Sequence, residues 1–260
     1  MVASVDDLFG GAAPYYAKYR SRYGDPAIEH LAMTFGQDST VLDLGCGPGT
    51  IAIPLSRRVR QVLAVDPDEE MLAEGRRLAG KAGGIRWIKG DSTTLRDLPP
   101  FDHVVMGRSF HWMDRRAVLA ELDELLPPHG VVALVGPTRE DPQEPWEPVV
   151  RRVRDEFAVN TFTASSSFQA TGEHHDEVLA TSPFSVLDRA HYEEHLPYDL
   201  DAVIGLQLSY SYSAPARLGA RKEAFVEAVR RALLAANPSG RWERVTVTEV
   251  LTARRPPRSP

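Results

Sequence analysis

The sequence lacks most of the features that would place it in a secreted or membrane class. It has a single cysteine, Cys46, which cannot form an internal disulfide. No apolar run approaches the roughly 18 residues of a membrane-spanning helix. The first ten residues, MVASVDDLFG, have neither the basic nor the apolar region of a signal peptide. We therefore expect a cytoplasmic protein with no membrane partner.

An excess of basic charge is also missing. Lysine and arginine together number 30 against 36 aspartates and glutamates, which gives a net charge of -6. This balance argues against nucleic acid as a partner. The rest of the composition, 43% hydrophobic and 25% charged, is that of a globular protein long enough to bury a substantial core. Nothing in it predicts an oligomeric state.

What the sequence does contain is a regular alternation of short apolar runs and helical patterns between residues 40 and 135. Helical spacing occupies residues 50–59, 67–80 and 114–130. This alternation is typical of βαβ units around a parallel sheet with helices on both faces. The five predicted strands are Thr40–Leu44, Gln61–Val65, Ile85–Lys89, Asp102–Met106 and Val131–Val135.

The rhythm changes after Gly136. A proline-rich segment is followed by a helical pattern at 146–160, a polar stretch at 163–177, and two strand patterns at 184–198 and 241–256 with helices between them. If the late strands join the sheet, the fold is a seven-stranded, mostly parallel α/β sheet with a lid insertion after the fifth strand. We expect one domain, 1–260, and its parts are an N-terminal helical cover (1–36), a cofactor-binding core (37–136), a lid with a late strand (137–220) and a terminal helix and strand (221–260).

A glycine-rich loop follows the first predicted strand, with Gly45, Gly47 and Gly49 in LGCGPGT. Glycine there lets the backbone approach a ligand, because no Cβ stands in the way. Dinucleotide-binding loops have G-x-G-x-x-G, whereas this loop has G-x-G-x-G and places Thr50 where the third glycine would fall. The loop alone does not decide between a dinucleotide and another kind of ligand.

Two aspartates end the next two predicted strands. Asp66 lies about twenty residues after the loop, where a carboxylate accepts hydrogen bonds from both hydroxyls of a ribose, in dinucleotide sites as in others. Asp91 is placed to meet an adenine amino group beside that ribose. Alternatively, Asp91 caps a turn, as Asp-Ser-Thr sequences often do.

Four segments in this order, VLDLGCGPGT, VLAVDPDEEML, IKGDSTTL and FDHVVMGRSFHWM, resemble the class I S-adenosylmethionine-dependent methyltransferases. The resemblance covers residues 10–136 and implies a Rossmann-like fold, S-adenosylmethionine as the cofactor and S-adenosylhomocysteine as its product. It implies that Asp66 binds the ribose, that Asp43 holds the loop and, through water, the cofactor's amino group, and that Arg20 meets the carboxylate. The full set of implied cofactor-binding residues is Tyr15, Arg20, Asp43, Gly45, Cys46, Gly47, Asp66, Pro67, Met71, Asp91, Ser92, Arg108 and Ser109.

The segment GRSFHWMD, Gly107 to Asp114, bears on the acceptor. It lacks the Asn/Asp-Pro-Pro-aromatic motif of family members that methylate nucleobases or glutamine amides. Together with LQLSYSYSAPARLG and TEVLTARRP, it is similar to small-molecule methyltransferases related to trans-aconitate methyltransferase. The Tyr-x-x-Tyr-Arg pattern ending at Arg20 fits the same subgroup, although Ser21 and Arg22 replace its Arg-Pro. A small-molecule acceptor is therefore expected.

The side chains that could act on the acceptor have alternative roles. His111 is the candidate base, but it could equally contact the cofactor or be a structural histidine. Phe110, Trp112, Tyr210 and Tyr212 could line the acceptor pocket or pack beneath a lid. We interpret Cys46 as a small residue of the loop, and the alternative is a catalytic thiol. We expect no metal at EHHDE, residues 173–177, because adjacent histidines point in different directions; a polar lid loop is predicted instead.

The expected activity is N- or O-methylation of a small molecule in bacterial specialised metabolism. Acidic residues of the lid would suit a cationic acceptor such as an amino sugar. The alternative is carboxyl methylation of a trans-aconitate-like acid, for which Arg108, Arg152 and Arg189 are candidates. Two other classes stay open, an NAD(P)-dependent oxidoreductase and a silent cofactor-binding protein. The acids of the lid are Glu173, Asp176, Glu193, Glu194, Asp199 and Asp201.

Overall fold

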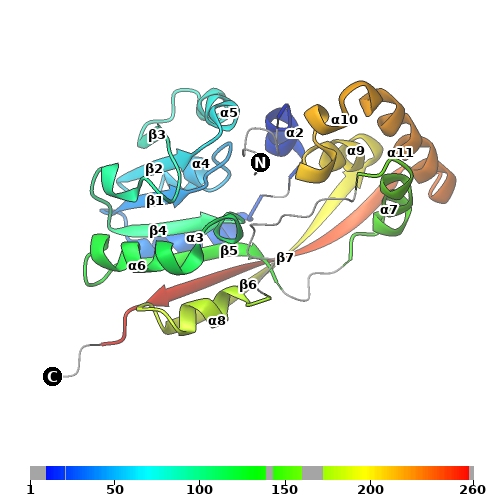
Figure 1. Cartoon of the computed structure of the whole chain (residues 1–260). Coiled ribbons are helices and arrows are strands. Elements are labelled where there is room, and N and C mark those ends of the chain that lie inside the picture. The colour runs from blue at the N-terminus through cyan, green and yellow to red at the C-terminus, as the bar shows by residue number, and fades with distance from the viewer. Residues whose placement is uncertain (1–9, 21, 139–142, 160–171, 258–260) are drawn as a thin grey trace. The chain divides into compact units, whose positions relative to one another are not determined.

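The computed structural model describes residues 10–20, 22–138, 143–159 and 172–257 (Figure 1). The chain divides into two compact units. We call one the helical unit (Met1–Arg22, Arg139–Thr163 and Glu193–Val247) and the other the sheet unit (Tyr23–Thr138, Ala164–Tyr192 and Thr248–Pro260). The domain boundaries expected from the sequence stay a prediction.

A seven-stranded sheet is the central element, as expected. Its order is β3-β2-β1-β4-β5-β7-β6. The first five strands run parallel to one another, and β7 is antiparallel to β5. The strands are β1 (Thr40–Leu44), β2 (Gln61–Asp66), β3 (Ile85–Lys89), β4 (His103–Gly107), β5 (Val131–Pro137), β6 (Val186–Asp199) and β7 (Arg241–Arg254). The five early strands match the predicted runs to within two residues.

The strand order reverses at β1, which lies between β2 and β4. The register pairs Leu44 with Val65 of β2 and Asp43 with Val105 of β4. The carboxyl ends of these three strands therefore meet at one edge of the sheet. In an open parallel sheet this switch point is where ligands bind.

Helices cover both faces of the sheet, because alternate side chains of each buried strand point to opposite sides. On one side Leu42 and Leu63 belong to a core shared with α6 and α8; on the other, Val41 and Val62 share a core with α3, α4 and α5. The helices of the sheet unit are α3 (Asp25–Phe35), α4 (Ala52–Leu55), α5 (Glu69–Ala79), α6 (Arg115–Leu125) and α8 (His175–Ala180), with 3-10 turns η1 (Leu95–Asp97) and η2 (Phe110–Trp112).

The helical unit has a core of its own around the fully buried Trp146, whose ring lies 4.9 Å from that of Tyr198. Its helices are α2 (Ala13–Tyr19), α7 (Glu147–Glu156), α9 (Leu200–Leu208), α10 (Pro215–Leu218) and α11 (Lys222–Ala236), with 3-10 turns η4 (Ser211–Ser213) and η5 (Gly219–Arg221). Among the described residues, no helix is long and apolar enough to cross a membrane.

Three expectations about local structure were wrong. The helix predicted over 50–59 is only the four residues of α4, which begins after the glycine loop and ends at Leu55. The first of the helices expected between the two late strands, whose pattern covers residues 199–213, ends at Leu208. Residues 173–177, expected as a polar loop, lead directly into α8, which starts at His175.

Candidate functional site

The glycine loop at the end of β1 needs its glycines for two different reasons. Gly45, Gly47 and Gly49 all have positive φ, of 73°, 52° and 80°. A Cβ on Gly45 would lie 2.4 Å from the Cβ of Ser109, and one on Gly49 would lie 2.5 Å from the Trp87 ring. Only Gly47 would place a Cβ in open space. Packing within the protein therefore accounts for two of the glycines, and Gly47 alone leaves room for a ligand.

Ser109 joins the loop to the end of β4. It is buried, and its Oγ donates a hydrogen bond of 2.6 Å to the carbonyl of Leu44. The same side chain fills the space beside Gly45. Ser109 thus holds the ends of β1 and β4 together, and the cofactor contact expected for it stays a prediction.

Cys46 is buried within the loop and donates to the carbonyl of Gly47 at 3.4 Å. Burial, reinforced by the nearby charges of Asp43 and Asp66, raises the pKa of its thiol well above the ordinary value. A nucleophilic thiol requires the opposite shift. The structure therefore favours the small loop residue over the catalytic thiol.

Asp66, at the end of β2, is tied to the loop by its carboxylate. Its Oδ2 accepts from the backbone N–H of Gly47 at 2.7 Å, and its Oδ1 accepts from that of Asp68 at 3.0 Å. Burial raises its pKa to about 6, although both N–H donors act in the opposite direction. Each oxygen accepts one of these bonds and has a further lone pair for a ligand hydroxyl.

Asp43, on β1, is the most strongly buried acid of the site, with 1% of its surface exposed. Its carboxylate accepts from the backbone N–H of Ala52, while Oδ2 has no hydrogen-bond partner in the described part of the chain. Burial, with a contribution from the charge of Asp66, raises its pKa to about 7. A buried acceptor without a donor is costly, so this oxygen fits a ligand ammonium group or a bridging water.

The predicted adenine side of the site lies at the ends of β2 and β3. Met71 is buried, Pro67 and Ser92 are half-buried, and Asp91 is exposed. The Oδ1 of Asp91 accepts from the N–H and the Oγ1 of Thr93, at 2.7 and 2.6 Å. The turn-capping alternative is thus what the structure shows, and the adenine contact stays a prediction.

Asp68 is a structural residue of the site that the sequence reasoning missed. Its Oδ1 accepts from the backbone N–H groups of Glu70 and Met71, which caps the start of α5. Its own N–H donates to Asp66. The signal was present in DPDEEM, where an aspartate precedes an acidic first turn.

At the end of β4, a residue with a strained backbone conformation lies against the ring of Tyr23. Arg108 has φ of 54°, a left-handed conformation that is unfavourable for a residue with a Cβ, and its guanidinium carbon lies 4.9 Å from the centre of the Tyr23 ring. A Cβ on Gly107 would come within 2.7 Å of the Tyr23 hydroxyl. Tyr23 is buried in the sheet unit, a role that its place in the tyrosine-rich segment YYAKYRSRY did not reveal.

The aromatic run after β4 separates into buried and exposed members. Phe110 is 2% exposed and Trp112 is 40% exposed. His111, which lies between them in the sequence, is half-buried. Its ring centre lies 4.9 Å from that of Trp112 and 6.4 Å from that of His175. The burial of Phe110 agrees with the packing alternative, and contact of Phe110, His111 or Trp112 with an acceptor stays a prediction.

The EHHDE segment serves as the start of α8. Glu173 accepts a 2.7 Å bond from Arg116, and Glu177 accepts from the backbone N–H of His174 in a capping box. His175 packs against Phe110, with ring centres 5.3 Å apart. The described residues include no group of three or more side chains suited to hold a metal ion.

The other predicted site residues lie in the helical unit. The guanidinium carbon of Arg20 is 4.1 Å from the centre of the Tyr210 ring, and its Nε is buried without a hydrogen-bond partner in the described chain. Tyr210 donates to Glu144 at 3.2 Å, and its ring stacks on Tyr212 at 5.0 Å. The structure thus brings Arg20, Tyr210 and Tyr212 together within this unit.

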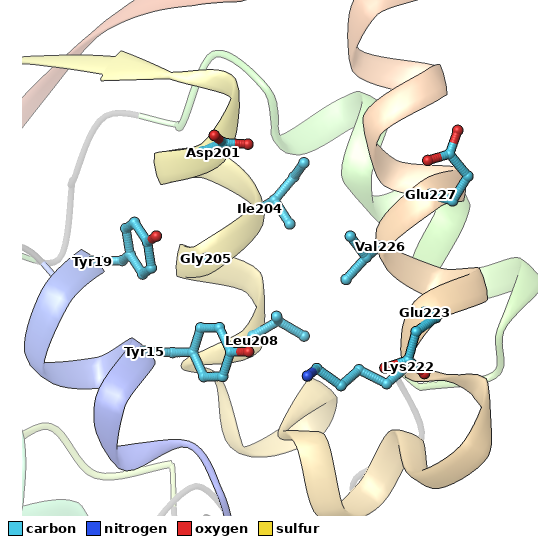
Figure 2. Close-up of a pocket in the computed structure, with 10 residues that line it drawn as sticks. All are labelled: Tyr15, Tyr19, Asp201, Ile204, Gly205, Leu208, Lys222, Glu223, Val226 and Glu227. Atoms are coloured by element: carbon cyan, nitrogen blue, oxygen red, sulfur yellow. The ribbon is translucent and has the colours of Figure 1, made fainter.

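Tyr15 lines a pocket of about 360 Å³ between α2, α9 and α11 of the helical unit (Figure 2). Tyr19 forms the same wall, and its ring lies so close to α9 that a Cβ on Gly205 would meet it at 2.2 Å. Lys222 reaches across the pocket from α11 and has its Nζ 5.7 Å from the centre of the Tyr15 ring (Figure 2). The cofactor contact expected of Tyr15 stays a prediction.

A glycine loop after β1, an acid at the end of β2 and an antiparallel β7 beside β5 define the class I methyltransferase fold. Residues 41–130 match the family model described as a methyltransferase domain. The chain is 31% identical over 161 residues to trans-aconitate 2-methyltransferase from Methylobacterium nodulans, which is 60% of each chain. It therefore spans three fifths of the length of that curated relative.

Solved structures show the same fold. A proposed type II methyltransferase from Anaeromyxobacter dehalogenans superposes with a TM-score of 0.66 at 21% identity, over 91% of this chain and 98% of the other. An S-adenosylmethionine-dependent methyltransferase from Thiobacillus denitrificans, in complex with S-adenosyl-L-homocysteine, has a TM-score of 0.53 at 14% identity, over 98% and 99%. Residues 41–130 therefore match a methyltransferase domain, and the chain has the fold of the class I S-adenosylmethionine-dependent methyltransferases.

Proposed function

We propose that the protein is an S-adenosylmethionine-dependent methyltransferase acting on a small molecule. The observation that carries this proposal is the arrangement of Asp43, Gly47 and Asp66 at the switch point. It offers an orphan buried carboxylate oxygen, an open backbone position and a second carboxylate with free lone pairs. These groups suit an ammonium, a close-lying ligand chain and a ribose diol, which S-adenosylmethionine combines.

The residues of the site bind and orient rather than react. When bound, the cofactor supplies a methyl group on a positively charged sulfur. Asp66 would fix the ribose and Asp43 the amino end, so that the reacting carbon is held at one place. Phe110 and Tyr23, both buried, limit the access of water at the end of β4. Proximity in a dry site supplies much of the acceleration of such a transfer, so an obvious base is not required.

The structure weakens the argument for a cationic acceptor. That argument rested on open carboxylates in the predicted lid, yet most of them have partners. Glu173 pairs with Arg116, Asp176 with Arg189, and Asp201 with Arg230. N- or O-methylation of an amine or hydroxyl in specialised metabolism stays a prediction without this support.

Carboxyl methylation of a trans-aconitate-like acid is the second candidate. It is favoured by the similarity to trans-aconitate 2-methyltransferase and by the lack of an open acidic surface among the residues just described. Two of the three arginines proposed for this role are engaged: Arg189 pairs with Asp176 and Glu249, and Arg108 lies over Tyr23. Arg152 is exposed on α7.

Mass spectrometry separates the candidates. The protein is incubated with S-adenosylmethionine carrying a deuterated methyl group and with pools of amines, alcohols and carboxylic acids. We expect a labelled methyl increment in one pool, with the carboxylic acids tested first. If S-adenosylhomocysteine binds but no pool is labelled, the protein is a silent cofactor-binding protein.

The oxidoreductase alternative makes a different prediction. NAD(P)H would then raise the thermal unfolding midpoint and S-adenosylhomocysteine would not, because a ligand stabilises only the protein that binds it. We expect the reverse.

A further inference from the structure

His175 lies beside His111 in the sheet unit, Arg115 lies beside His175, and the site described above gives neither of them a role. The ring of His175 is nearly parallel to that of His111, at an interplanar angle of 20° and a centroid distance of 6.4 Å. It also packs against the buried Phe110. His175 therefore links the candidate base to the core.

The contact with Arg115 determines which tautomer the neutral His175 ring adopts. The guanidinium of Arg115 is buried, and its Nη1 lies 3.5 Å from the Nδ1 of His175 and 3.1 Å from the carbonyl of Glu173. A guanidinium can only donate, so Nδ1 must be the acceptor and the proton of the neutral ring must sit on Nε2. Burial lowers the pKa of His175 to about 4, and the neighbouring His111 and Arg115 act in the same direction, in that order.

We infer that His175 and Arg115 form a positioning pair that keeps His111 neutral and correctly oriented at the end of β4. A neutral imidazole can take up a proton from the hydroxyl or amine of the methyl acceptor while the oxygen or nitrogen lone pair of that group attacks the methyl carbon. The electrons of the broken carbon–sulfur bond stay on sulfur, and the proton passes from His111 to solvent. This inference rests on the proposed function.

Among the charged side chains around His175, Arg115 is the buried one. Glu173 has an oxygen 3.9 Å from Arg115 but gives its shorter contact, 2.7 Å, to Arg116. On α8, Asp176 raises the pKa of His175 and His174 lowers it, both less than burial does. Arg116 is exposed and pairs with the same Glu173, which makes it a matched control for Arg115.

Nuclear magnetic resonance of the full chain labelled with ¹⁵N-histidine tests the pair without any acceptor. The His111→Asn and His175→Asn variants assign the two rings. At pH 7 we expect His175 to give the signals of a neutral ring protonated on Nε2. A charged ring, or one protonated on Nδ1, would overturn the inference, and this result needs no variant of Arg115.

The pH titration gives the second readout. Arg115→Met should raise the titration midpoint of His111 by about half a pH unit, because it removes the positive charge that contacts the neighbouring His175. Arg116→Met should leave it unchanged. Equal midpoints in wild type and a folded Arg115→Met variant would contradict the pair. A missing thermal shift with S-adenosylhomocysteine would instead contradict the proposed function, and it would leave the tautomer result as it stands.

Discussion

Buried or half-buried acids occur in both units, but the groups that bind them differ. In the sheet unit, Asp43 and Asp66 accept hydrogen bonds from backbone N–H groups and from no arginine of the described residues, and burial raises the pKa of both. In the helical unit, Glu147 pairs with Arg154, and Glu144 pairs with Arg244 at 2.9 Å. An acid that pairs with an arginine has its counter-charge supplied by the protein itself. An acid left without a counter-charge indicates a place where a ligand completes the structure.

The largest effect should come from the acid at the end of β2. Asp66→Ala removes both the contacts to the loop and the proposed ribose acceptor, so we expect the affinity for S-adenosylhomocysteine to fall at least about 100-fold. Calorimetric titration measures it. Glu147→Gln in the helical unit is the control and should bind like the wild type. Unchanged affinity in Asp66→Ala would mean that the ribose has been misplaced.

The glycine loop separates packing from ligand access. Gly45→Ala should lower the free energy of unfolding by about 3 kcal/mol, because its Cβ overlaps Ser109 in addition to the cost of positive φ. Gly47→Ala should cost only about 1 kcal/mol, since its Cβ meets open space, yet it should weaken S-adenosylhomocysteine binding.

Denaturant unfolding measures the two free energies. The double variant Gly45→Ala, Ser109→Gly should recover part of the loss if the overlap is its cause. Equal losses at Gly45 and Gly47 would contradict this account of the loop.

The arginine network of the helical unit should affect stability and not binding. Arg154 donates to Gln207 and Tyr212, each at 3.2 Å, and pairs with Glu147. Arg154→Met leaves Glu147 with only its exposed partner, Arg151 at 3.3 Å, and we expect a loss of about 2 kcal/mol in unfolding free energy. The affinity for S-adenosylhomocysteine should stay within about threefold of the wild type. A large loss of affinity in a folded variant would place the network in the binding site.

The smallest effect is a dependence of stability on pH. Asp43 has a raised pKa of about 7 in the folded protein, so its contribution is present at low pH and is lost as the pH rises through 7. Asp43→Asn cannot ionise and keeps an acceptor for the N–H of Ala52. It should therefore be more stable than the wild type by about 1–2 kcal/mol at pH 8 and should equal it only near pH 4 or below, where Asp43 is protonated in the folded and the unfolded protein.

His103 contributes with the opposite sign. Burial lowers its pKa to about 4, so its contribution is present above the unfolded value near 6.5 and is lost as the pH falls toward 4. The two contributions therefore oppose each other between about pH 4 and 6.5 in the wild type, and unfolding of the Asp43→Asn variant at several pH values isolates that of Asp43. An Asp43→Asn variant that parallels the wild type from pH 5 to pH 8 would contradict the raised pKa of Asp43.

The sequence predicted the elements whose causes are local. Alternating apolar runs gave the five parallel strands, and strand ends gave Asp43 and Asp66, because a parallel sheet brings those ends together. The reason for Gly45 was not predictable, since it depends on Ser109, which is distant in the chain. His175 was missed for the same reason. It lies in a polar stretch without periodicity, and only its contacts with Phe110 and Arg115 give it a role.

The most direct test of the central claim is a calorimetric titration of the wild-type protein with S-adenosylhomocysteine, with NAD⁺ as the matched competitor. We predict one S-adenosylhomocysteine bound per chain and no heat of binding from NAD⁺. Binding of NAD⁺ without binding of S-adenosylhomocysteine would contradict the assignment of the switch-point acids.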